Sequence, residues 1–168
     1  MVTIRWCLQK NGGLELVEPN SAIANSYIKM AEESIDALKN LEKSRLWTAV
    51  TAYYIFYYSL YSLMMRLGVK CEIHSCSLEF MKQYLRLFYN SEDVAMIEKA
   101  FNARINLQYY ADRPVDDKDV ENAKAYCKVF FIKTKDSLAR ATEKQLQQVR
   151  EDLRKEISSQ KKSIFEIV

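Results

Sequence analysis

The sequence contains little glycine, proline or histidine. Three glycines and two prolines among 168 residues are too few to form the many turns of a β fold. Leucine, methionine, lysine and glutamate are plentiful, and all four favour helices. A chain of this length buries about 70% of its unfolded surface, so it needs neither a disulfide nor a metal to fold. We therefore expect a single all-α domain.

A strong charge bias and an apolar leader are also lacking. The net charge of +3 does not by itself indicate a nucleic-acid-binding protein, because such domains usually have a pI above about 9. The first residues show no apolar core of a signal peptide, so we expect a cytoplasmic protein. In that reducing compartment the widely spaced cysteines would be free thiols that pack as small apolar side chains. These cysteines are Cys7, Cys71, Cys76 and Cys127.

One segment, residues 49–67, is long and nearly uncharged. It carries no charge before Arg66 and approaches the length of a membrane span. Tyrosines crowd its middle, whereas tyrosines of membrane proteins prefer the bilayer interface. A helix that neighbours cover on several sides explains this composition better. We therefore expect no membrane association and assign the tyrosine row to the core.

Apolar residues recur every three or four positions along most of the chain, as one face of a helix requires. This spacing predicts an up-and-down bundle of about five helices over residues 20–141, preceded by an irregular segment over residues 1–19. Turn and capping signals place the helices near residues 20–39, 43–67, 74–89, 90–110 and 117–140.

Residues 142–168 differ in character from the bundle and predict an additional C-terminal helix. Thr142 and Gln145 match a capping box at its start. A narrow apolar seam follows among charged residues, and it is too short for a coiled coil. The seam consists of Leu146, Val149, Leu153 and Ile157. It would pack either on the bundle or on a partner chain, and in the second case the protein would be a purely structural interaction module.

Four short motifs follow one another between residues 20 and 140. They are Thr48-Ala49-Val50-Thr51-Ala52-Tyr53-Tyr54, then Gly68-x5-His74, then Ala103-Arg104-Ile105-Asn106-Leu107-Gln108-Tyr109-Tyr110, and finally Phe130, Phe131 and Lys135. Their order resembles the HEPN (higher eukaryote and prokaryote nucleotide-binding) family. The resemblance implies a helical bundle, often a homodimer, that works beside a small nucleotidyltransferase in toxin–antitoxin pairs. It implies no cofactor.

The RNA-cleaving branches of that family need no metal, and they carry an arginine followed four to six residues later by a histidine. Arg104 matches the arginine, but Tyr109 and Tyr110 follow it, and His74 is the only histidine. A histidine suits proton removal from a ribose hydroxyl because its pKa is near neutral. A tyrosine is only about 0.1% ionised at pH 7, which would cost about a thousandfold in rate. We therefore assign no catalytic residue and keep a metal-independent ribonuclease that uses Arg104 as an alternative.

The same residues are better suited to binding a nucleotide or RNA. The guanidinium of Arg104 can donate paired hydrogen bonds to a phosphate, and Tyr109 and Tyr110 offer faces for base stacking. The resemblance implies a further role for either tyrosine, as the acceptor of AMP from a partner nucleotidyltransferase. It also places a histidine at the position of His74, which predicts a polar contact toward Arg104. Alternatively, Arg104 forms an ion pair with a carboxylate such as Asp112 while the tyrosines pack in the core.

Residues 71–76 could also be interpreted as part of a zinc site, but the signal for it is weak. Cys71, His74 and Cys76 could each supply a ligand, but a structural zinc site needs a fourth. Only Cys7 or Cys127 is left, and neither belongs to a CxxC pair. We therefore assign no metal.

Overall fold

A computed structural model describes residues 2–41, 43–110 and 112–165, with side chains through residue 160. Its elements are α1 Ile4–Gln9, β1 Glu15–Leu16, α2 Ser21–Leu38, α3 Arg45–Leu67, β2 Val69–Lys70, α4 His74–Tyr84, α5 Ser91–Tyr109, α6 Asp117–Arg140 and α7 Glu143–Phe165. The predicted all-α class and helical bundle are confirmed. Within the described residues the only sheet is the antiparallel pair of β1 and β2.

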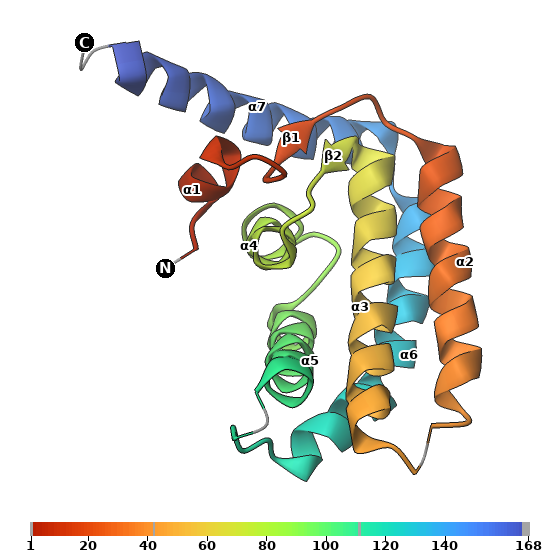
Figure 1. Cartoon of the computed structure of the whole chain (residues 1–168). Coiled ribbons are helices and arrows are strands. Elements are labelled where there is room, and N and C mark those ends of the chain that lie inside the picture. The colour runs from red at the N-terminus through yellow and green to blue at the C-terminus, as the bar shows by residue number, and fades with distance from the viewer. Residues whose placement is uncertain (1, 42, 111, 166–168) are drawn as a thin grey trace.

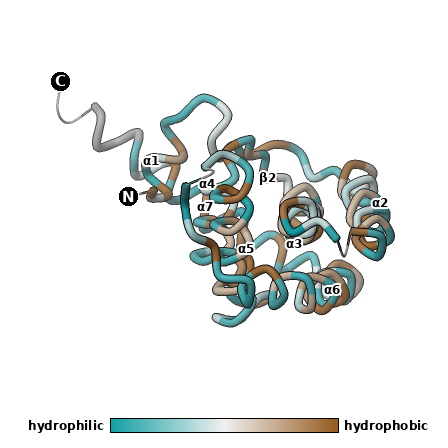
Figure 2. Tube along the Cα trace, turned by 60° about the horizontal axis from the view of Figure 1, so that its bottom comes forward, coloured by the Kyte–Doolittle hydropathy of each residue, from teal (hydrophilic) through white to brown (hydrophobic). Residues whose placement is uncertain are grey.

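The helices surround α3. Helices α2, α3 and α6 lie side by side, whereas α4 and α5 are seen nearly end-on in the same view and therefore run across them (Figure 1). Helix α3 contacts α2, α5 and α6, and Figure 2 shows these three neighbours around it. This position explains why α3 is apolar on nearly every side. No helix in the described part of the chain is long and apolar enough to cross a membrane.

Local signals set the limits of α3. Ser44 accepts a hydrogen bond from the backbone of Trp47 at the start, and Gly68 ends the helix in the left-handed conformation with φ of 69°, as a C-terminal glycine commonly does. Tyr53 is fully buried, and Tyr57 is nearly so. The core assignment of the tyrosine row is thus confirmed for these two residues and for Tyr61, although Tyr54 and Tyr58 remain half-buried and Tyr54 faces the candidate site described below.

The N-terminal residues are more ordered than the sequence predicted. Thr3 accepts a hydrogen bond from the backbone of Trp6 and starts the short helix α1. Strand β1 then pairs with β2, with Glu15 opposite Lys70. The prediction of an irregular segment was wrong because both elements are too short to show a periodic pattern. They depend on contacts with residues far along the chain.

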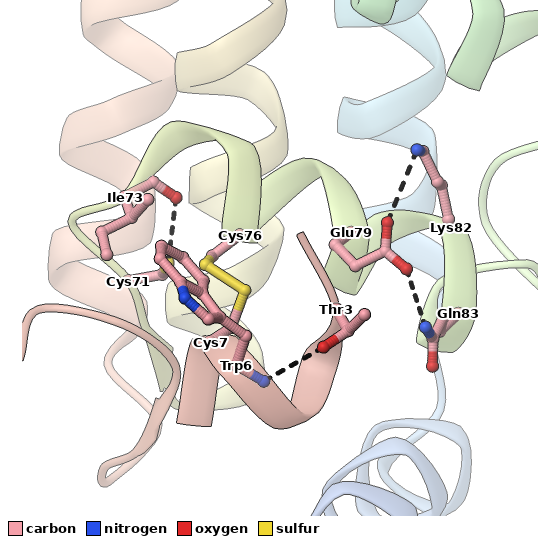
Figure 3. Close-up of a disulfide and its surroundings, with 9 residues drawn as sticks. All are labelled: Thr3, Trp6, Cys7, Cys71, Ile73, Cys76, Glu79, Lys82 and Gln83. Atoms are coloured by element: carbon pink, nitrogen blue, oxygen red, sulfur yellow. Dashed lines mark hydrogen bonds and ion pairs between the residues drawn. A yellow bond between two sulfur atoms is a disulfide. The ribbon is translucent and has the colours of Figure 1, made fainter. Parts of the chain in front are cut away.

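A disulfide between Cys7 and Cys76 joins α1 to α4 (Figure 3). Both cysteines are completely buried. The prediction of free thiols was therefore wrong for this pair, because their proximity arises only when α1 packs on α4. It is confirmed for Cys71 and Cys127, which are free and buried. The bond also removes Cys76 from the zinc set considered above.

Helix α5 begins with a capping box that fixes its orientation. Asn90 accepts a hydrogen bond from the backbone of Asp93, and the Asp93 carboxylate accepts one from the backbone of Asn90 in return. Asp93 is fully buried, and it also binds the ammonium of Lys133 and the hydroxyl of Tyr126 on α6. These contacts hold the start of α5 against α6. The C-terminal end of α5 carries the candidate site described below.

The C-terminal helix packs on the bundle. Leu146, Val149 and Leu153 are buried in the same core as α3. Of the two predicted placements of the seam, on the bundle or on a partner chain, the structure therefore shows the first. Arg150 donates hydrogen bonds to the carbonyls of Val17, Leu67 and Gly68. Because the last carbonyls of a helix lack partners within it, this arginine completes the end of α3.

Candidate functional site

Arg104 lies near the C-terminal end of α5 among aromatic rings. Its Nη2 donates hydrogen bonds to the hydroxyls of Tyr54, at 3.3 Å, and Tyr109, at 3.2 Å. The guanidinium carbon lies 5.7, 5.6 and 5.2 Å from the ring centres of Tyr53, Tyr54 and Tyr109, within the range of a cation–π interaction. The side chains of α3 and α5 together hold this cation.

No carboxylate compensates the charge of Arg104 within the described residues. Arg104 is only 9% exposed, yet it forms none of the ion pairs of the described chain, and its buried Nε has no hydrogen-bond partner. Asp112 is exposed on the turn after α5 and makes no ion pair with it. The alternative in which Arg104 pairs with Asp112 is therefore wrong. A buried charge without a partner costs several kcal/mol, so Arg104 has unused capacity to bind an anion.

His74 is the first residue of α4 and borders the same tyrosines. Its Nδ1 lies 2.5 Å from the hydroxyl of Tyr53, and its ring stacks on Tyr57 at a centre distance of 3.9 Å and an angle of 5°. The ring centre also lies 6.1 Å from that of Tyr54. Tyr53 and Tyr54 thus contact both His74 and Arg104. The predicted polar contact between His74 and Arg104 is therefore indirect, because these tyrosines connect the two residues.

Burial and charge change the pKa values of these groups. Desolvation and the nearby charge of Arg104 lower the pKa of His74 to about 4, so the imidazole is neutral at physiological pH. Desolvation raises the pKa of Tyr53 and of Tyr57 far above the ordinary value, so both phenols keep their protons. The cluster therefore carries one fixed positive charge, on Arg104, surrounded by neutral rings.

The two tyrosines that end α5 have different surroundings. Tyr109 contacts Arg104 while remaining 61% exposed, so one face is open to a ligand. Tyr110 is 40% exposed, and the guanidinium of Arg113 lies 3.5 Å from its ring centre. The structure thus brings His74, Arg104 and Tyr109 into one cluster and leaves Tyr110 and Asp112 outside it.

Sequence reasoning missed Tyr53 and Tyr54 as members of the site. Both were assigned to the core with the rest of the tyrosine row, and Tyr53 is indeed buried. Their hydroxyls nevertheless meet His74 and Arg104, which are 21 and 50 residues away along the chain. The sequence did contain a signal, because the motif that ends at Tyr54 holds two adjacent tyrosines. The motif does not specify which of the two rings faces α5.

Two cavities of the protein lie away from the Arg104 cluster. A cavity of about 660 Å³ lies between the N-terminal segment and α7, lined by residues that include Leu14 and Ile157. Another of about 390 Å³ lies between the end of α2 and α6. Neither is lined by a residue of the Arg104 cluster, so a ligand of the cluster would contact chiefly its accessible groups, Tyr109 and the half-buried His74.

No family model, no curated protein and no solved structure matches this chain. The resemblance to the HEPN family therefore rests on the short motifs given above, and the site is interpreted from its own geometry.

Proposed function

We propose that this protein is a HEPN-type module that binds a nucleotide or a nucleic acid through Arg104 and Tyr109. The observation that supports the proposal is the buried guanidinium of Arg104, which has no carboxylate partner among the described residues and keeps an unused Nε. A phosphate supplies the missing negative charge and accepts charge-assisted hydrogen bonds from it. Tyr109, which is largely exposed, provides the adjacent surface for a base, and such stacking contributes about 1–3 kcal/mol per base.

Titration with AMP and with a short single-stranded RNA tests this function. Arg104→Met should weaken binding of either ligand at least tenfold, because about 1.4 kcal/mol or more of charge-assisted bonding is lost. Arg86→Met is the matched control, since Arg86 is exposed and its Nε donates only to the carbonyl of Lys82. Equal affinities of wild type and Arg104→Met, or no binding to either ligand, would contradict the proposal.

A metal-independent ribonuclease is the second candidate. The linear motif lacks its histidine, but the fold brings His74, the only one in the sequence, to the tyrosines that contact Arg104. Cleavage of RNA in the presence of a chelator, abolished by Arg104→Met and by His74→Gln alike, would establish this activity.

Partner interactions belong to the same proposal. We include a homodimer. We also include a small nucleotidyltransferase that transfers AMP from ATP to the hydroxyl of Tyr109 or Tyr110 with release of pyrophosphate, because both tyrosines are exposed. Mass spectrometry after co-expression with such an enzyme would show the adduct on either tyrosine.

We also propose a cytoplasmic location. The disulfide is compatible with it because the complete burial of Cys7 and Cys76 slows attack by soluble reductants on the folded chain.

A further inference from the structure

We infer that His74 is a hydrogen-bond donor for a bound phosphate: its Nε2 carries the ring proton, and with Arg104 it forms a site whose free polar groups all donate. This inference rests on the proposed function and deepens it, because it specifies the ligand chemistry of the site and the role of the histidine. It also argues that His74 does not act as the general base of a ribonuclease.

The contact with Tyr53 determines the tautomer of His74. The hydroxyl of Tyr53 lies 2.5 Å from Nδ1 of His74, and it makes no other hydrogen bond within the described residues. Tyr53 is completely buried, so its phenolic proton needs an acceptor, because a buried donor left unpaired costs about 1–3 kcal/mol. Nδ1 is that acceptor only if it carries no proton. We therefore assign the ring proton to Nε2, since a neutral imidazole carries one proton.

The opposite nitrogen of His74 is accessible. Nε2 makes no hydrogen bond to any described residue, and it is not among the buried polar atoms that lack a partner. His74 as a whole is half-buried. An N–H at Nε2 therefore reaches solvent, on the side of the ring opposite to Nδ1, which Tyr53 contacts.

The remaining polar groups of the cluster are donors as well. Nη2 of Arg104 donates to the hydroxyls of Tyr54 and Tyr109, so each phenol uses its oxygen as acceptor and keeps its own proton to donate. Nε of Arg104 has no partner among the described residues and is itself buried, so Arg104 acts on a ligand through its charge and the rest of its guanidinium. A ligand that offers several acceptors and negative charge, with no need to donate, suits the Nε2–H of His74, the two phenols and the charge of Arg104 together. A phosphate oxygen cluster has this character, whereas a metal cation does not.

Nitrogen-15 NMR of the free protein tests the tautomer directly. Because the chain has a single histidine, its spectrum contains one imidazole and needs no assignment. At pH 7 we expect a protonated Nε2 and a bare Nδ1 in the wild type, and a mixture of both neutral tautomers in Tyr53→Phe. A proton on Nδ1, or on both nitrogens, would overturn the inference and leave the proposed function intact.

Titration with a dinucleotide phosphodiester separates a donor from a base. His74→Gln keeps an amide N–H and should bind within about threefold of wild type, whereas His74→Leu removes the donor and should lose about fivefold to tenfold, as expected for one hydrogen bond of about 1 kcal/mol. Equal binding by His74→Leu and wild type would refute the donor role alone. Absence of binding by the wild type would refute the proposed function together with this inference. RNA cleavage that His74→Gln abolishes would show that the histidine acts as a base.

Discussion

Arg104 and Arg150 are both arginines withdrawn from solvent, and they differ in what their guanidinium groups contact. Arg150 donates to three backbone carbonyls beside the end of α3, whereas Arg104 meets two phenols and leaves Nε unused. Binding sites commonly keep such uncompensated groups at the expense of stability. Of the two replacements, only that of Arg150 should therefore lower the stability.

Arg104→Met should leave the free energy of unfolding unchanged or raise it by about 1–2 kcal/mol, because it removes a buried charge without a counter-ion. Arg150→Met, the comparison, should lower it by about 1–3 kcal/mol, because carbonyls at the end of α3 lose their donor. Urea denaturation at pH 7 measures both. A loss above about 1 kcal/mol in Arg104→Met would indicate that the arginine is a structural residue.

His74 should make stability depend on pH in mildly acidic solution. Its pKa is lowered from 6.5 to about 4 in the folded protein, by desolvation and by the charge of Arg104. Between these values the unfolded chain binds a proton that the folded chain does not, so stability is fully present above pH 6.5 and decreases as the pH falls toward 4. Partial solvent screening of the half-buried ring reduces the full effect to about 1–2 kcal/mol.

Chemical denaturation between pH 7.5 and pH 4.5 measures this dependence. His74→Gln is the matched control, because its side chain does not titrate, and it should show a smaller decrease over the same range. Parallel curves for the two proteins would mean that the ring is not desolvated by its tyrosine neighbours.

At the scale of secondary-structure elements, the disulfide attaches α1 to the helix that carries His74. It closes a segment with a sequence separation of 69 residues, and a link of this kind restricts the unfolded chain. Urea denaturation in the presence of a dithiol reductant, which reaches the buried bond once the chain unfolds, should therefore give a free energy of unfolding about 2–4 kcal/mol lower for the wild type. Cys7→Ser should start from the lower value and show no further response to the reductant. A response in Cys7→Ser, or none in the wild type, would contradict the bond.

The elements themselves were largely predictable because their signals are local. Gly68 ends α3, Asn90 caps α5, and Thr142 with Gln145 forms the predicted box at the start of α7. Each of these signals involves residues within one turn of the helix that it limits. Where a boundary depends on distant contacts, the prediction failed: the third predicted helix was extended to residue 89, but α4 ends at Tyr84.

The site was less predictable because it is assembled from three separate parts of the chain. Arg104 and Tyr109 lie on one helix and were recognised together. Their contacts to α3, and the bond between Tyr53 and His74, depend on how α3, α4 and α5 cross. No spacing in the sequence specifies those crossings. For the same reason the pairing of Cys7 with Cys76 could not be derived, since connectivity does not follow from cysteine positions alone.

At the scale of the whole molecule, the position of α7 determines whether the tail belongs to the fold or to an interface. Leu153 is completely buried in the core of its own chain, so Leu153→Ala should lower the free energy of unfolding by about 2–5 kcal/mol. Glu151→Ala on the exposed face of the same helix should change it by less than about 0.5 kcal/mol. Urea denaturation gives these values, and light scattering gives the mass of each variant in solution. If the seam instead held two chains together, Leu153→Ala would halve the mass while each chain kept its stability. Because Leu153 and Arg150 lie one turn apart on α7 and both contact the bundle of the same chain, we expect the loss of stability.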